Sequence, residues 1–192
     1  MEKIFVVKFT GPFGFIKPWT AVRDSETYSQ QFLTPSIVAG MERKLFPELL
    51  KDDDGEIKKI IGHRLSYCGL STQQERTWSK GGISIKREKG VYKTNQGIID
   101  RGIMLEPHLH LAFFNKNDAE IAFKQSICLC RNEDILLPES ILEMDQKEFN
   151  LINGFELIFT DESSGFKVGH NRFKKAAGMY GELKVFGNPI RN

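Results

Sequence analysis

Alternating apolar and polar residues open the chain. Between Lys3 and Phe9, β-branched and aromatic side chains recur at every second position, which predicts a strand. The turn-rich stretch GPFGF at 11–15 ends that strand. Residues 17–32 then mix polar and aromatic side chains without a regular period, which predicts a long loop.

The next segment has the pattern of an amphipathic helix. Residues 37–45 carry Ile, Met and Leu at four-residue spacing, which gives one apolar face. Thr34 is expected to cap this helix, and Pro35 suits its first position. The helix should end before Pro47. Gly40 costs about 1 kcal/mol relative to alanine, which a very close approach of the helix to the sheet would explain.

The later apolar runs predict the rest of a sheet and a second helix. The order strand, helix, strand, insertion, strand, helix, strand predicts an α+β fold, a split β-α-β sheet with its helices on one face. We expect strands at 57–67, 98–114 (broken at Pro107), 135–137, 155–160 and 183–186, and a helix capped by Asn117-Asp118 that carries Ile121, Phe123 and Ile127.

The polar middle of the chain, residues 71–96, has the pattern of a hairpin. Gly81-Gly82 precedes isoleucines that alternate with polar residues, and Gly90 separates them from Val91-Tyr92. We expect this hairpin to project from the core as an insertion.

Composition indicates one soluble domain spanning residues 1–192. Hydrophobic residues make up 40% and charged residues 27%, and the net charge is only +2, so any basic footprint must be local. The first residues lack a signal-peptide pattern and no run is long enough to span a membrane, so we expect a cytoplasmic protein without membrane contact. Three cysteines without a C-x₂-C knuckle argue against a disulfide framework or a zinc site.

Basic residues gather in the expected hairpin, with Trp78 and Tyr92 interleaved. Cations that meet phosphates and rings that stack on unpaired bases suit single-stranded nucleic acid. A solvated hairpin whose two aromatic residues pair across the strands explains the pattern equally well. The basic residues are Arg76, Lys80, Lys86, Arg87, Lys89, Lys93 and Arg101, set against Glu75, Glu88 and Asp100.

A second basic cluster occupies the glycine-rich segment 163–181, which we expect to form a loop. Glycines allow the backbone to approach a phosphate chain closely. An ordinary solvent-facing loop is the simpler alternative. The candidate contacts are Lys167, His170, Arg172, Lys174 and Lys175.

Catalytic and metal-binding patterns are weak. His108 and His110 could lie on one face of a strand as a metal pair with Glu106, but no fourth ligand is evident. His63 beside Arg64, or His170 beside Arg172, could serve a metal-free ribonuclease, although neither arrangement is specific. The sequence contains no Walker loop, dinucleotide fingerprint or G-x-S-x-G elbow. We therefore expect no cofactor, no metal and no catalysis.

The order of these features resembles the RAMP superfamily of CRISPR-associated proteins, and most closely the fifth Cas family. The first strand runs into GPFGFIKPW, and the helix LTPSIVAGMERKLF matches the family pattern through Pro35, Ser36, Ile37, Val38, Gly40 and Met41. The resemblance implies a ferredoxin-like (RRM-like) RAMP fold in which residues 71–96 form an inserted thumb hairpin and 101–113 return from it. The chain is short for the family, which suggests a compact type IV or minimal type I version.

The resemblance also implies a role in antiviral or anti-plasmid defence. In a Cascade-like ribonucleoprotein, such a subunit grips the 5′ handle of the crRNA while the thumb orders the first guide nucleotides, and base pairing reads the target. The implied partners are crRNA, a backbone subunit of the Cas-seven type, a large or Cas-eight-like subunit, and target DNA. One branch of the family cleaves precursor RNA with Tyr, Lys and His. Tyr28, Lys44, His63 and Tyr67 do not match its spacing, so we expect a structural subunit.

Two alternatives remain open at this level. A guide-processing ribonuclease of the sixth Cas family is disfavoured because that family usually has two ferredoxin-like domains. A protein-only scaffold would bind no RNA, whereas phosphate contacts make RNA binding depend on salt. The residues expected to line the RNA are Lys8, Lys17, Arg23, Arg76, Trp78, Lys80, Lys86, Arg87, Lys93, His170, Arg172, Lys174 and Lys175.

Overall fold

The computed structural model describes residues 3–19, 26–52, 55–78, 85–94 and 96–191. It has an α+β fold with mostly antiparallel strands and few helices, as the sequence predicted. No helix in the described ranges is both long and apolar enough to cross a bilayer.

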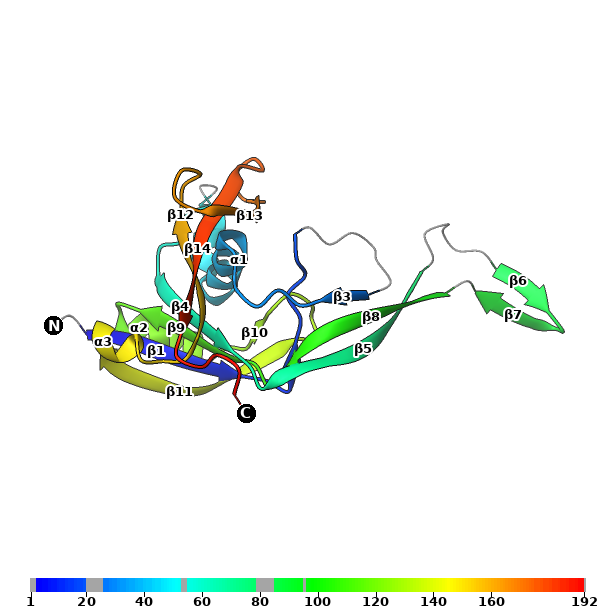
Figure 1. Cartoon of the computed structure of the whole chain (residues 1–192), viewed down its shortest axis with the longest axis horizontal. Helices are drawn as coiled ribbons and strands as arrows, with labels where there is room; N and C mark the ends of the chain where they lie inside the picture. The colour runs from blue at the N-terminus through cyan, green and yellow to red at the C-terminus, as the bar shows by residue number, and fades with distance from the viewer. Residues whose placement is uncertain (1–2, 20–25, 53–54, 79–84, 95, 192) are drawn as a thin grey trace.

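An eight-stranded antiparallel sheet forms the body of the molecule (Figure 1). β1 lies in its interior between β9 and β11. In spatial order the strands are β10 (Ile127–Cys128), β11 (Ile135–Asp145), β1 (Lys3–Thr10), β9 (His108–Phe113), β4 (Ile60–Ser66), β12 (Gly154–Thr160), β14 (Gly178–Phe186) and β13 (Phe166–His170).

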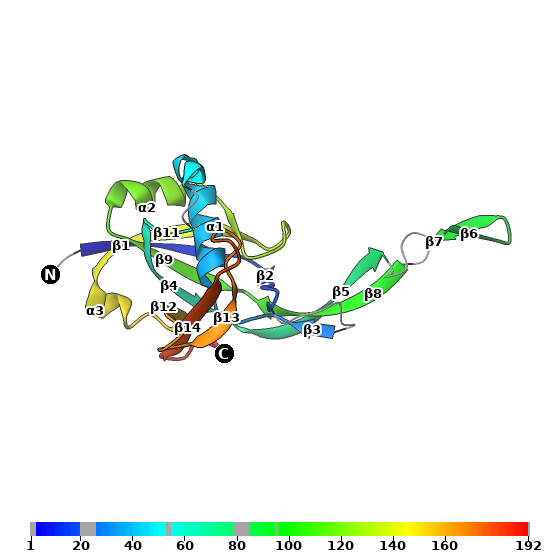
Figure 2. The same ribbon diagram turned by 90° about the horizontal axis from the view of Figure 1, so that it is seen from above.

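The helices cover the two faces of this sheet unequally. α1 (Pro35–Leu45) and α2 (Lys116–Phe123) pack on one face, where Val7, Phe9 and Val38 belong to the main core (Figure 2). The short α3 (Gln146–Phe149) covers part of the opposite face by placing Phe149 against Ile4 and Val6. A 3₁₀ helix, η1 (Pro47–Lys51), follows α1. The odd and even residues of β1 therefore enter separate apolar clusters.

α1 begins at Pro35 as predicted and ends before Pro47. Thr34 occupies the N-cap position, but the expected capping bond is wrong because the Thr34 hydroxyl accepts no helical N–H. Glu42 is fully buried on this helix. Its carboxylate accepts hydrogen bonds from the backbone N–H groups of Lys58 (3.0 Å) and Ile60 (2.9 Å), which joins α1 to the start of β4.

The boundaries of α2 differ from the prediction. Asn115, and not Asn117, is the N-cap, and its side chain accepts a hydrogen bond from the N–H of Asn117 at 2.8 Å. Ile127 was expected on this helix but lies in β10, where it pairs with Leu136. Burial of Ile127 beneath the sheet edge takes precedence over its helical spacing.

A two-stranded arm projects from the body in Figures 1 and 2. β5 (Gly69–Trp78) and β8 (Gln96–Leu105) pair antiparallel along their whole lengths, so the pairing reaches beyond both ends of the expected segment 71–96. β6 (Ile85–Glu88) and β7 (Val91–Thr94) form a second hairpin closer to the tip. Lys89 (φ 48°) and Gly90 (φ 80°) make its turn, since consecutive positive φ angles suit tight hairpins.

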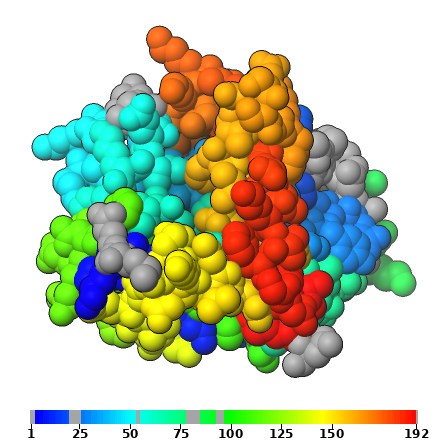
Figure 3. Space-filling view, turned by 60° about the vertical axis from the view of Figure 1, so that its left-hand side comes forward, coloured from blue at the N-terminus to red at the C-terminus, as the bar shows by residue number. Residues whose placement is uncertain are grey.

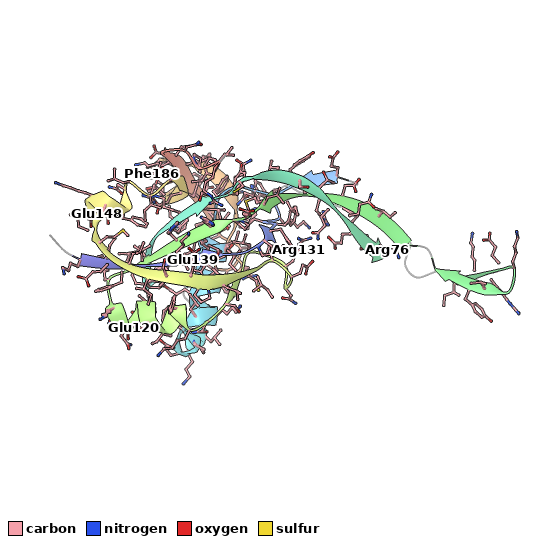
Figure 4. The ribbon with its side chains drawn as sticks, turned by 90° about the horizontal axis from the view of Figure 1, so that it is seen from below. Arg76, Glu120, Arg131, Glu139, Glu148 and Phe186 are labelled. Atoms are coloured by element: carbon pink, nitrogen blue, oxygen red, sulfur yellow. The ribbon has the colours of Figure 1, made fainter. Side chains whose placement is uncertain are left out.

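The base of the arm is braced on its other edge. β8 pairs there with β2 (Phe13–Gly14) and, in parallel, with β3 (Glu26–Tyr28), a strand inside the predicted long loop. Arg131 donates hydrogen bonds to Asp134 (Nη2 to Oδ1, 2.6 Å) and to Gln73 of β5 (3.1 Å). Figure 4 places Arg131 where the body meets the arm. These contacts tie the arm to the 128–134 segment.

The tail contains more strand than expected. The segment 163–181 was expected to be a loop, but β13 and the beginning of β14 lie within it and pair with each other. Val168 and Met179 are buried between these strands and the body, so apolar packing orders a segment whose glycines and lysines suggested a loop. β11 likewise extends past the predicted 135–137 to Asp145 because it pairs with the full length of β1.

Replacing Arg131 with alanine should loosen the arm. The change removes the hydrogen bonds to Gln73 and leaves the fully buried Asp134 without its cation, so we expect a loss of about 1–3 kcal/mol in the free energy of unfolding. Amide hydrogen exchange should accelerate in β5 and β8 more than in α2. Lys116→Ala, at an exposed position of α2, is the control. Unchanged exchange in β5 and β8 would contradict the bracing role.

Candidate nucleic-acid interface

The arm carries exposed cations along its length. Arg76 on β5 and Lys86 and Arg87 on β6 are all exposed, and Figure 4 shows Arg76 far from the body. The Arg87 guanidinium lies 5.9 Å from the ring centroid of its cross-strand neighbour Tyr92, which is 69% exposed. An exposed ring beside a cation can stack on a base while the cation meets a phosphate.

The other basic and aromatic residues predicted to bind RNA near the arm lie in different surroundings. Arg101 at the base donates to Glu75 at 3.1 Å and lies over the Phe15 ring, so it has a bracing role. Trp78 and Lys93 are placed as members of β5 and β7 by their backbones. Arg23 and Lys80 lie outside the described residues.

The tail meets the first loop at an aromatic contact. The Trp19 ring lies edge-on to His170, with 6.0 Å between ring centroids. Gly169 (φ 135°) makes this approach possible, since a Cβ there would lie 3.2 Å from Trp19 Cβ. The fold thus joins the exposed Lys17 loop to His170 of the tail. Trp19, 49% exposed, was missed from sequence, although its position in the turn-rich GPFGFIKPW stretch could have indicated it.

The three tail cations after His170 lie in different surroundings. The Arg172 guanidinium lies against α1 at Gly40, while Lys174 and Lys175 are exposed on the turn that follows. The expectation that Gly40 allows a close approach of α1 to the sheet is therefore corrected. The space that a side chain at position 40 would fill is occupied by Arg172 and by the Phe173 ring.

Lys8 lies on the face of the sheet that α3 covers only in part. Its ammonium donates to Glu139 at 2.9 Å, and it is in register with His110 of β9, which is in register with Arg64 of β4. No described contact connects Lys8, His110 and Arg64 with a cation of the arm. Lys8 therefore stands apart from the other predicted RNA ligands, with a carboxylate already bound.

Burial holds His63 and His110 on the body neutral. Burial, reinforced by the Arg64 charge, lowers the pKa of His63 to about 3. Burial and the nearby Lys8 lower the pKa of His110 to about 4. His63 also stacks on Phe159 at 5.5 Å. Both are packed core side chains, and no group of three or more His, Cys, Asp or Glu in the described ranges could hold a metal.

Arg64 is likewise part of the core. Its guanidinium carbon lies 4.4 Å from the ring centroid of Phe149 and 3.5 Å from that of Phe186. The guanidinium also forms an ion pair with Glu156. Figure 3 shows α3 (yellow) beside the C-terminal strand (red) on the outside of this cluster. Burial lowers the pKa of Arg64 to about 10, which still leaves it charged at neutral pH. His63 and Arg64 are both almost fully buried.

Comparison with known proteins gives a match in structure alone. Neither a family model nor a curated protein matches this sequence. Among solved structures, a chain of a CRISPR RNA-guided surveillance complex superposes with a TM-score of 0.55 at 10% identity, covering 97% of this chain and 90% of that one. The two chains share a fold. The crystal structure of a Cas protein gives a TM-score of 0.49 at 13% identity and covers 98% of both chains.

The resemblance to CRISPR-associated proteins is therefore confirmed at the level of the fold. The match covers nearly the whole chain. The residues that would contact RNA are not tested by it, and they remain predictions.

The buried histidines should make stability fall in mild acid. Because their folded pKa values lie below the ordinary 6.5, the unfolded chain takes up protons first as the pH falls through 6.5. For His63 the loss should reach about 2 kcal/mol at pH 5, and stability should be constant above pH 7. Urea unfolding at pH 7.5 and pH 5 measures it.

The control uses the substitution His63→Asn, which should reduce the difference between the two pH values. Carboxylates with lowered pKa, such as Glu139 and Glu143, act below this window. Equal free energies of unfolding at pH 7.5 and pH 5 in the unsubstituted protein would contradict the buried, neutral state of these histidines.

Proposed function

We propose that this chain is a structural RNA-binding subunit of a CRISPR effector complex, where it holds the 5′ handle of a crRNA. The observation that carries the proposal is the long arm with exposed cations, built on a body that shares its fold with a chain of a CRISPR RNA-guided surveillance complex. Binding would be electrostatic and local, since the whole chain has a net charge of only +2.

The ferredoxin-like interpretation extends this proposal to the body. β1, α1, β4, β9, α2 and β11 follow the order strand, helix, strand, strand, helix, strand, and their strands lie in the spatial order β11-β1-β9-β4. The arm is inserted between β4 and β9. We take this unit as the RAMP domain and the arm as its thumb.

The arm would act on RNA through two kinds of contact. Arg76, Lys86 and Arg87 can neutralise phosphates, and the exposed Tyr92 ring offers a stacking surface for a base. Where the first loop meets the tail, Lys17 and Trp19 beside His170 repeat the combination of a cation and an exposed aromatic ring. A single strand that follows both groups would run from the tail toward the arm.

The partners follow from the same proposal. The crRNA would be shared with a backbone subunit of the Cas-seven type and with a large or Cas-eight-like subunit, and target DNA would pair with the guide and not with this chain. The protein would work in the cytoplasm, where guide complexes meet invading nucleic acid.

The role proposed here is non-catalytic. A general base for RNA cleavage must reach a 2′-hydroxyl, and His63 is buried beneath Phe159. Tyr67 is also buried, Tyr28 packs over Gly102 at the base of the arm, and Lys44 lies on α1. The burial of His63 and Tyr67 supports binding over cleavage.

Reversing two arm charges should weaken RNA binding. For a short fluorescent single-stranded RNA, Lys86→Glu with Arg87→Glu should raise Kd at least about tenfold. The slope of log affinity against log salt should also fall by about 1.4, because two phosphate contacts are lost from a single strand. Fluorescence anisotropy across a salt series measures both quantities.

The matched control reverses two exposed charges on the body, Lys124→Glu with Lys147→Glu, and should bind as the unsubstituted chain does. Equal affinity of the arm variant and the control would reject the arm as the binding surface. Absence of salt-dependent binding by every variant would favour a protein-only scaffold, and shortened RNA after incubation would favour a ribonuclease.

A further inference from the structure

A pocket lies between α1 and the segment that begins with β10, at the point where the tail crosses the helix. Its volume is about 230 Å³. Apolar side chains form one part of its wall, and two cations and two thiols form another. The residues used below are Ile37, Met41, Lys44, Cys128, Leu129 and Arg172.

The turn 171–177 fixes the backbone at Arg172. Asn171 is buried, its backbone N–H donates to Ala177 O (2.8 Å), and its side chain accepts from the N–H of Phe173 (2.9 Å). The Phe173 ring contacts two guanidinium groups: its centroid lies 4.6 Å from Arg43 Cζ and 4.8 Å from Arg172 Cζ. The exposed Arg172 side chain therefore extends into the pocket from a backbone that the turn holds in place.

Gly40 makes room for this guanidinium. A Cβ at position 40 would come within 2.6 Å of Arg172 Nη2, a distance that requires the side chain to move. A glycine in a helix interior costs about 1 kcal/mol relative to alanine. The helix therefore loses stability at the position where Arg172 enters the pocket.

The second cation of the pocket follows one turn later on the same face of α1. Lys44 is exposed, and its ammonium lies 3.8 Å from Cys128 Sγ. Neither Lys44 nor Arg172 forms an ion pair with a carboxylate anywhere in the described part of the chain. Two such cations across a small pocket favour a bound anion.

We propose that this pocket binds one nucleotide of the RNA, with a phosphate between Lys44 and Arg172 and the base or ribose against Ile37, Met41 and Leu129. The inference rests on the proposed function and names a contact that lies on the body, away from the arm. A guanidinium donates two parallel hydrogen bonds to a phosphate, and the apolar wall suits the faces of a base. An acidic peptide would use the cations but leave the apolar wall without a matching group.

Cysteine footprinting tests the pocket directly. Cys128 and Cys130 line it, and Cys68 lies elsewhere, directly before β5. Saturating single-stranded RNA should slow alkylation of Cys128 and Cys130 by N-ethylmaleimide at least about fivefold and leave Cys68 unchanged. Gly40→Ala, which displaces Arg172 without changing the charge, should abolish this protection and raise the Kd for RNA.

Paired substitutions separate charge from shape. Arg172→Gln should lower the salt slope of RNA binding by about 0.7, as expected for one lost phosphate contact to a single strand, whereas Gly40→Ala should leave more of the slope in place. Lys124→Gln, a neutralised charge on the body outside the pocket, is the control. Thermal unfolding of Gly40→Ala establishes that the variant is folded, since alanine favours the helix.

The outcomes distinguish this inference from the proposed function. Salt-dependent RNA binding with unprotected Cys128 and Cys130 would overturn the pocket and leave the RNA-binding role standing. Absence of RNA binding by the unsubstituted protein would reject both the pocket and the proposed function. Protection by a poly-glutamate peptide, with none by RNA, would overturn the nucleotide assignment and make the pocket a docking site for an acidic protein segment.

Discussion

Pairing of β8 on both of its edges allows the arm to extend from the body. A lone two-stranded ribbon is only marginally stable in water, and β5 alone would give β8 no more than that. The base of β8 gains β2 and β3 on its free edge, and Arg131 ties β5 to the buried Asp134. The pairing and hydrogen bonds at the base of the arm therefore stabilise a thin ribbon that is otherwise surrounded by solvent. The exposed cations farther out can then face a ligand without contributing to the core.

The same division between scaffold and contact surface holds in the body. Charged groups inside it are paired or neutral: Arg64 with Glu156, Glu42 with backbone N–H groups of the chain entering β4, and His63 without a proton at neutral pH. Buried charges are tolerated only with such partners. Lys44 and Arg172, which form no ion pair with a carboxylate of the described residues, lie at the surface beside α1.

Local pattern predicted much of this fold and little of its contact surface. The alternation in β1, the four-residue spacing in α1 and the turn residues near Gly90 each reflect interactions between close neighbours, and these elements were predicted correctly. The strands in 163–181 were missed because their order comes from Val168 and Met179 packing on the distant body. The contact of Trp19 with His170, and that of Gly40 with Arg172, join residues more than a hundred positions apart, and no local period encodes them.

The central claim is that this chain holds guide RNA inside a larger assembly, and purification from a native host tests it most directly. A tagged copy expressed from its own genomic context should be isolated, its bound RNA sequenced and its companion proteins identified. The account predicts short, uniform RNAs with a constant 5′ end, recovered together with other subunits, and a loss of that RNA when the arm charges are reversed. An RNA-free protein recovered alone under low salt would contradict it.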